Sequence, residues 1–147
     1  MKGKNRVKEG EDVTSDFEPR IRRLAAEARK RRKNRFRDDE HDTGDAGRTP
    51  EERATAAARD GLGPVVALYV EARTVPDGVR FSQREMELLH CATNDWLSVY
   101  AACYGVDVDP DFTVREAAEL LVDTHDIRET AALLTKIPDR VHGGNGL

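Results

Sequence analysis

Cysteine and long apolar stretches are both scarce in this sequence, and each scarcity excludes a class of protein. The only cysteines, Cys91 and Cys103, fall in one predicted helix about 18 Å of rise apart, so they cannot form a disulfide with each other. The N-terminal residues carry no apolar run, and we expect neither a signal peptide nor a membrane span. These absences predict a protein of the reducing cytoplasm with no membrane partner.

Aromatic side chains are also few, at 5% of the chain, and hydrophobic residues reach only 38%. Part of the chain should therefore remain unpacked, and the core must consist mostly of alanine, leucine and valine. Those residues suit a small bundle of helices, so the sequence predicts an all-α fold.

Lysine is almost absent after Lys33, with Lys136 as the one exception, and the charge is distributed unevenly. Residues 1–37 carry 14 basic and 6 acidic side chains, whereas the remaining 110 residues carry 10 basic and 22 acidic ones. The asymmetry predicts a basic tail on an acidic body.

The basic segment has a weak helical pattern. Phe17, Ile21 and Leu24 recur at three- and four-residue steps, and Asp16 is placed to cap a helix there. The apolar stripe ends near residue 29, and residues 38–47 switch to Asp, Glu and Gly. We therefore expect residues 1–48 to be a basic arm, flexible or helical, with an acidic linker, outside the folded domain.

Residues 49–138 are predicted to form a domain of about five helices. A capping residue followed three positions later by Glu marks a helix start, because each side chain bonds to a backbone amide that the helix leaves open. This pattern occurs four times in the segment: Thr49 with Glu52, Ser82 with Glu85, Thr113 with Glu116, and Asp126 with Glu129.

The first of these helices should end near Asp60 and Gly61. Residues 64–74 suit a buried strand or a buried helix, and we favour a helix because no second strand is evident to pair with them. The third helix should run from about Gln83 to Tyr104, with Gly105 as its stop.

The last two helices repeat a pattern, since TVREAAELL at residues 113–121 resembles DIRETAALL at residues 126–134. A short turn between them predicts a helical hairpin, followed by a disordered tail at residues 139–147. The expected core side chains of the third helix and the hairpin are Met86, Leu89, Trp96, Leu97, Tyr100, Val114, Ala118, Leu121, Ile127, Ala131 and Leu134.

A run of seven cations is the leading candidate for a binding site, because closely spaced cations contact nucleic-acid phosphates and release counterions. The alternative is a solvated arm, partly neutralised by the five acids of residues 38–45. The seven side chains are Arg29, Lys30, Arg31, Arg32, Lys33, Arg35 and Arg37.

The C-terminal hairpin also has the outline of a helix-turn-helix motif. Its second helix begins with Asp126 and Glu129, and their carboxylates lie where phosphate and base contacts are expected. The charge therefore disfavours groove reading.

Two short motifs resemble the metal motifs of terpene cyclases, but both are incomplete. The second motif begins with Asn94, Asp95 and Ser98, yet Ala102 stands where an acid is required. The first motif falls in the linker, at Asp38, Asp39 and Asp42. On the helical wheel Asn94, Asp95 and Ser98 lie opposite Trp96 and Tyr100, where we expect solvated polar residues.

No catalytic, cofactor or metal site is predicted. The four histidines, His41, His90, His125 and His142, are scattered, and no zinc pattern, phosphate loop or nucleophile elbow is present. An enzyme would have only an unaided acid such as Asp95 or Glu71.

Three segments between Gly61 and Pro138 carry a family resemblance: GLGPVVALYVEART, NDWLSVYAACYGVDVD and FTVREAAELLVDTHDIRETAALL. They resemble small uncharacterised proteins of salt-adapted microbes that are grouped as a domain of unknown function. The resemblance implies a fold unit and no activity.

These observations favour a non-enzymatic interaction module that binds a protein partner or a second copy of itself. The competing hypothesis is a nucleic-acid-associated protein that is anchored by residues 29–37.

Overall fold

The computed structural model describes residues 16–36, 48–76 and 78–137 of the chain. Every regular element within these ranges is helical, which confirms the all-α prediction. In chain order the elements are α2 (Glu18–Lys33), α3 (Pro50–Ala56), the π-helical segment η2 (Ala57–Leu62), α4 (Gly63–Thr74), α5 (Gln83–Cys103), α6 (Val114–Thr124) and α7 (Ile127–Thr135).

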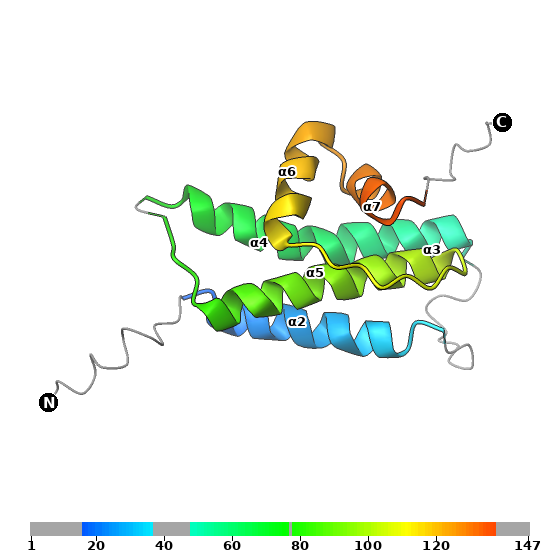
Figure 1. Ribbon diagram of the computed structural model, residues 1–147, viewed down its shortest axis with the longest axis horizontal. Helices are drawn as coiled ribbons and strands as arrows, with labels where there is room; N and C mark the ends of the chain where they lie inside the picture. The colour runs from blue at the N-terminus through cyan, green and yellow to red at the C-terminus, as the bar shows by residue number, and fades with distance from the viewer. Residues whose placement is uncertain (1–15, 37–47, 77, 138–147) are drawn as a thin grey trace, which may run out of the picture.

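Helix α5 is the centre of the molecule and contacts every other helical element (Figure 1). Helix α2 lies along one side of α5, and the continuous run of α3, η2 and α4 lies along another side. The hairpin of α6 and α7 packs across α4, η2 and α5, so the predicted C-terminal hairpin is confirmed. Within the described part of the chain, no helix has the length and apolar character needed to cross a membrane.

The core is lined largely by alanine and by the apolar stripe of α5. Of the core side chains expected from the sequence, seven are buried: Leu89, Trp96, Leu97, Tyr100, Val114, Ala118 and Ala131. The other four are partly buried and pack against this cluster: Met86, Leu121, Ile127 and Leu134. Small alanine side chains allow the helices to approach closely, which suits a domain with few aromatic residues.

Three helix starts have complete capping boxes, at Thr49, Ser82 and Thr113. The fourth differs, because the Asp126 side chain accepts from the amides of Arg128 and Glu129 while its own amide donates to Thr124 Oγ1. Asp16 does not cap α2; the cap residue is Phe17, which makes no side-chain capping bond.

The segment 64–74 is helical, but the predicted break at Asp60 and Gly61 is wrong. The chain continues through a π-helical turn in which the Gly63 amide donates to the Ala58 carbonyl. In an α-helix the ring of Pro64 would clash with the carbonyl four residues earlier, and the wider π turn relieves that clash. Gly61 lies within this helical run, and the position requires glycine because a Cβ atom there would lie 2.4 Å from the ring of Trp96.

The basic arm was expected to lie outside the domain, whereas α2 packs on α5 with Ile21, Ala25 and Ala28 buried. At its N-terminal end the ring of Phe17 contacts that of Phe81, with centroids 6.2 Å apart. The apolar stripe is short and made mostly of alanine, so its sequence pattern is weak although Ile21, Ala25 and Ala28 are buried. The acidic linker at 38–47 and the tail at 139–147 lie outside the described residues.

Candidate functional site

The structure divides the basic run of residues 29–37 into two sets. The first set, Arg31, Arg32 and Arg35, contacts side chains of the rest of the domain. Arg29, Lys30 and Lys33 are exposed, and Arg37 falls outside the described residues. The six described cations of the run therefore do not share one surface.

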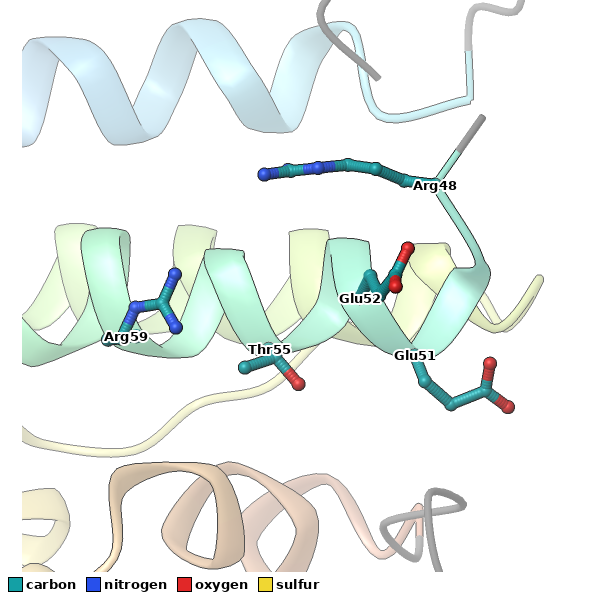
Figure 2. A pocket seen from close by; sticks show the side chains of 5 residues that line it. All are labelled: Arg48, Glu51, Glu52, Thr55 and Arg59. Carbon is teal, nitrogen blue, oxygen red and sulfur yellow. The ribbon is translucent and has the colours of Figure 1, made fainter. Parts of the chain in front are cut away.

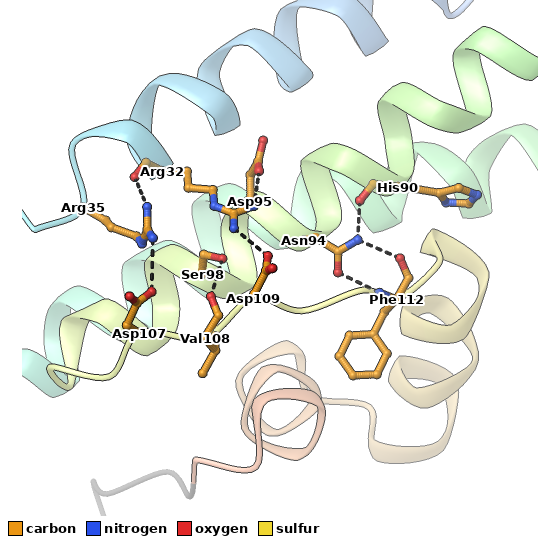
Figure 3. Close-up of polar contacts among 10 residues, drawn as sticks. All are labelled: Arg32, Arg35, His90, Asn94, Asp95, Ser98, Asp107, Val108, Asp109 and Phe112. Atoms are coloured by element: carbon orange, nitrogen blue, oxygen red, sulfur yellow. Dashed lines mark hydrogen bonds and ion pairs between the residues drawn. The ribbon is translucent and has the colours of Figure 1, made fainter.

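Arg32 and Arg35 form a clamp between α2 and the rest of the domain (Figure 3). The Arg32 guanidinium donates to Asp95 of α5 at 2.9 Å and to Asp109 at 3.0 Å. Arg35 donates to Asp107 at 3.2 Å and to the Arg32 carbonyl at 2.7 Å. The hydrogen bond to Asp95 is the main reason why the pKa of Arg32 is raised, although burial opposes it.

Arg31 lies over the indole ring of Trp96, with 5.3 Å between the guanidinium carbon and the ring centroid. Trp96 is 4% exposed and its ring also covers Gly61. The contact has the geometry of a cation–π interaction, so a third cation of the run stabilises the docking of α2.

Two acids of the clamp, Asp107 and Asp109, belong to a strap without regular structure, residues 106–113, which is tied to α5 by polar side chains (Figure 3). Asn94 donates to the Phe112 carbonyl and accepts from the Phe112 amide, both at 2.8 Å. One turn further along α5, Ser98 donates to the Val108 carbonyl at 3.3 Å. The expectation that Asn94 and Ser98 are solvated is wrong, because both are buried beneath the strap.

His90 continues this polar row one turn before Asn94. Its Nδ1 atom accepts from the amide of Val114 at 3.0 Å, at the first turn of α6. Burial lowers the pKa of His90, and the nearby carboxylates of Glu116 and Glu87 oppose that shift. Only the neutral form of His90 holds the first turn of α6, because a protonated Nδ1 cannot accept the hydrogen bond from the Val114 amide.

The outward side of α2 carries four exposed cations, here called the cationic face: Arg23, Arg29, Lys30 and Lys33. None of the four forms an ion pair with another residue in the described ranges. Helical spacing places Arg23 and Lys30 on the side opposite Ile21, Ala25 and Ala28, together with the exposed Glu27. Lys33 lies beside them, and Arg29 lies on the flank of the helix next to Ala25. Arg23 lies outside the run of seven cations. Its spacing of seven residues from Lys30 indicates that the two side chains share one side of a helix, and this spacing is visible in the sequence.

The two acids considered for catalysis are both engaged in ion pairs. Asp95 pairs with Arg32, and Glu71 pairs with Arg20 at 3.2 Å. Among the residues that the structure describes, no three His, Cys, Asp or Glu side chains gather as a metal ion would require.

An open groove of about 390 Å³ runs along α3 and η2 (Figure 2). It is lined by Arg48, Glu51, Glu52, Thr55 and Arg59. The carboxylates of Glu51 and Glu52 point away from each other, and Glu52 is occupied by the capping box of α3. The two carboxylates of the groove therefore do not converge on one point.

The hairpin does not gain the features of a groove-reading motif. Asp126 occupies the N-terminus of α7, where it accepts from two backbone amides. A phosphate approaching that end of the helix would meet a carboxylate in place of open amides.

Comparison with known proteins identifies a family but no characterised relative. The family model described as "Domain of unknown function (DUF8055)" matches residues 15–139, which include α2. No curated protein and no solved structure shows significant similarity to the chain.

Proposed function

Given that the chain belongs to the DUF8055 family, a domain of unknown function, we propose that it is a non-enzymatic interaction module that binds an anionic partner through the cationic face of α2. The observation that carries the proposal is the exposure of four cations on a helix that packs on α5, none of which forms an ion pair with another described residue.

The fixed orientation of α2 supports a binding role. Ile21 and Ala28 are 1% and 0% exposed, and the clamp ties the C-terminal half of the helix to α5 and to the strap. A partner therefore meets cations that are already positioned, and less conformational entropy is lost on binding than with a flexible arm.

The distribution of charge supports the same surface. Residues 16–36 contain nine basic and three acidic side chains, while the chain as a whole has a net charge of −4. The electrostatic field of the protein attracts an anionic partner to α2 and repels it from the acidic remainder, so the partner should bind on the α2 side of the molecule.

The two acids considered for catalysis, Asp95 and Glu71, are both held in ion pairs, which supports a role without catalysis by either acid. We place the protein in the cytoplasm because Cys91 and Cys103 are both free thiols, as a reducing compartment maintains them.

The proposal is tested by titrating the full chain with two defined polyanions, a heparin oligosaccharide and poly-glutamate, at low salt. The double variant Lys30→Gln/Lys33→Gln should bind several-fold more weakly than the wild type. The matched control Arg80→Gln/Arg84→Gln removes the same charge from exposed side chains near the other end of α2 and should bind like the wild type. Absence of binding to both polyanions, or equal losses in both variants, would overturn the proposal.

A further inference from the structure

Resting on this proposed function, we infer that the anionic partner is a single-stranded nucleic acid, held by its phosphates on the cationic face and by one base on the ring of Phe36. Two independent observations support the inference: the length of the cationic face, and an exposed aromatic ring in the segment that follows α2.

The cationic face matches the charge spacing of a nucleic-acid strand. From Arg23 to Lys33 the helix rises about 15 Å. A strand with stacked bases presents a phosphate about every 3.4 Å, so four or five phosphates fall within the length of four cations. An acidic peptide would need closely spaced carboxylates along the side that faces α2. A nucleic-acid strand carries one phosphate charge on every nucleotide, whatever its sequence.

Phe36 supplies the second contact. It follows the last turn of α2, three residues beyond Lys33, and its side chain is 50% exposed. The Arg35 guanidinium lies over its ring at 5.1 Å, while Arg35 itself is fixed by Asp107. Unpaired bases stack on exposed aromatic rings that accompany a row of cations in single-strand-binding proteins, and arginine adds a cation–π contact there.

The fold disfavours recognition of a duplex. Asp126 and Glu129 occupy the first turn of α7, the helix that would enter the major groove, and they carry negative charge there. Bases in a duplex are already stacked on one another, so the ring of Phe36 would gain no base partner.

The test measures fluorescence anisotropy of a labelled oligothymidine of about 20 nucleotides, and of a duplex of the same length, across salt concentrations. With four phosphate contacts, the logarithm of the association constant should fall with the logarithm of salt with a slope of about −3. In Lys30→Gln/Lys33→Gln the slope should be about −1.5, with a loss of roughly tenfold to hundredfold in affinity at low salt.

Phe36→Ala should weaken oligothymidine binding about tenfold at every salt concentration and leave the slope unchanged, because stacking involves no counterion release. The control Val122→Ala, which trims a side chain that is 63% exposed on α6, should bind like the wild type. Thermal melting of each variant verifies that the fold is retained.

Each alternative outcome has a distinct meaning. Duplex bound as tightly as oligothymidine, or no effect of Phe36→Ala, overturns the single-strand inference while the polyanion proposal stands. Binding of heparin or poly-glutamate without nucleic acid also overturns the inference alone. Loss of all polyanion binding overturns both, and a mass of two chains at low salt without nucleic acid identifies a second copy as the occupant.

Discussion

At the scale of single residues, Gly61 shows how one position determines the packing of the helix that contains it. Its backbone lies against the indole of Trp96, and a Cβ atom would meet ring carbons at 2.4 to 2.6 Å. The Arg31 guanidinium also lies over this ring, and Trp96 is 4% exposed, so the ring has little room to move. A larger side chain at this position would force the π-helical segment away from α5.

Gly61→Ala should therefore lower the free energy of unfolding by about 1 to 3 kcal/mol, the usual cost of overpacking a core. Gly63→Ala is the matched control, since its Cβ would find its nearest neighbour at 3.4 Å. It should be neutral or stabilise by up to about 1 kcal/mol, because alanine reduces the entropy of the unfolded chain. Urea unfolding measures both, and equal effects would contradict the account of Gly61.

The sequence does not predict that the polar residues Asn94 and Ser98 of α5 are buried or that they bind the strap. Asn94 and Ser98 lie opposite Trp96 on the helical wheel, where a surface helix presents solvated side chains. The strap that covers them is 10 to 18 residues away in sequence and has no regular structure of its own. No local pattern indicates that a loop will lie across a polar side of a helix.

At the scale of elements, helix starts were predictable because their determinants are local. Thr49, Ser82 and Thr113 each bond with a Glu three residues away, and the sequence shows both partners. The join between η2 and α4 was not predictable in the same way. Asp60, Gly61 and Pro64 are typical helix breakers, yet packing against Trp96 holds this segment in a continuous helix.

His90 makes the start of α6 sensitive to pH. Its pKa in the folded state lies below its ordinary value of 6.5, because burial disfavours the charged ring. The unfolded chain therefore binds more protons just below pH 6.5, and the free energy of unfolding should fall as pH decreases through this range. Below the folded-state pKa the loss should level off.

His90→Gln tests this prediction, since a glutamine carbonyl is able to accept from the Val114 amide and does not titrate. The difference in unfolding free energy between wild type and variant, measured by urea denaturation from pH 5 to pH 8, isolates His90 from the other histidines. Parallel pH curves for the two proteins would show that His90 does not contribute.

At the scale of the whole molecule, the clamp joins segments that are far apart in the chain. Arg32 is 63 residues from Asp95 and 77 residues from Asp109. The sequence predicted that acids would neutralise part of the basic run, but it offered the adjacent acids of residues 38–45 as the partners. Pairing over such distances follows from the packing of α2 on α5, which the short apolar stripe indicates only weakly.

Arg32→Gln should lower the free energy of unfolding by about 1 to 2 kcal/mol, because it leaves the carboxylate of Asp95, 13% exposed, without its cation. Lys33→Gln removes the same charge from the neighbouring exposed position and should change stability by less than about 0.5 kcal/mol. Chemical denaturation of the two variants at equal ionic strength gives the comparison. Equal effects would mean that the clamp does not stabilise the fold.

The clamp, the cationic face and the proposed binding role all require that α2 is part of the folded core with one side turned outward. Native-state amide hydrogen exchange measures this without altering the protein. The amides of Ala25 and Ala28 should exchange as slowly as those in the middle of α5, through opening of the whole domain. Exchange of these amides at the rate of an unstructured chain, while α5 stays protected, would contradict the account and restore the flexible arm.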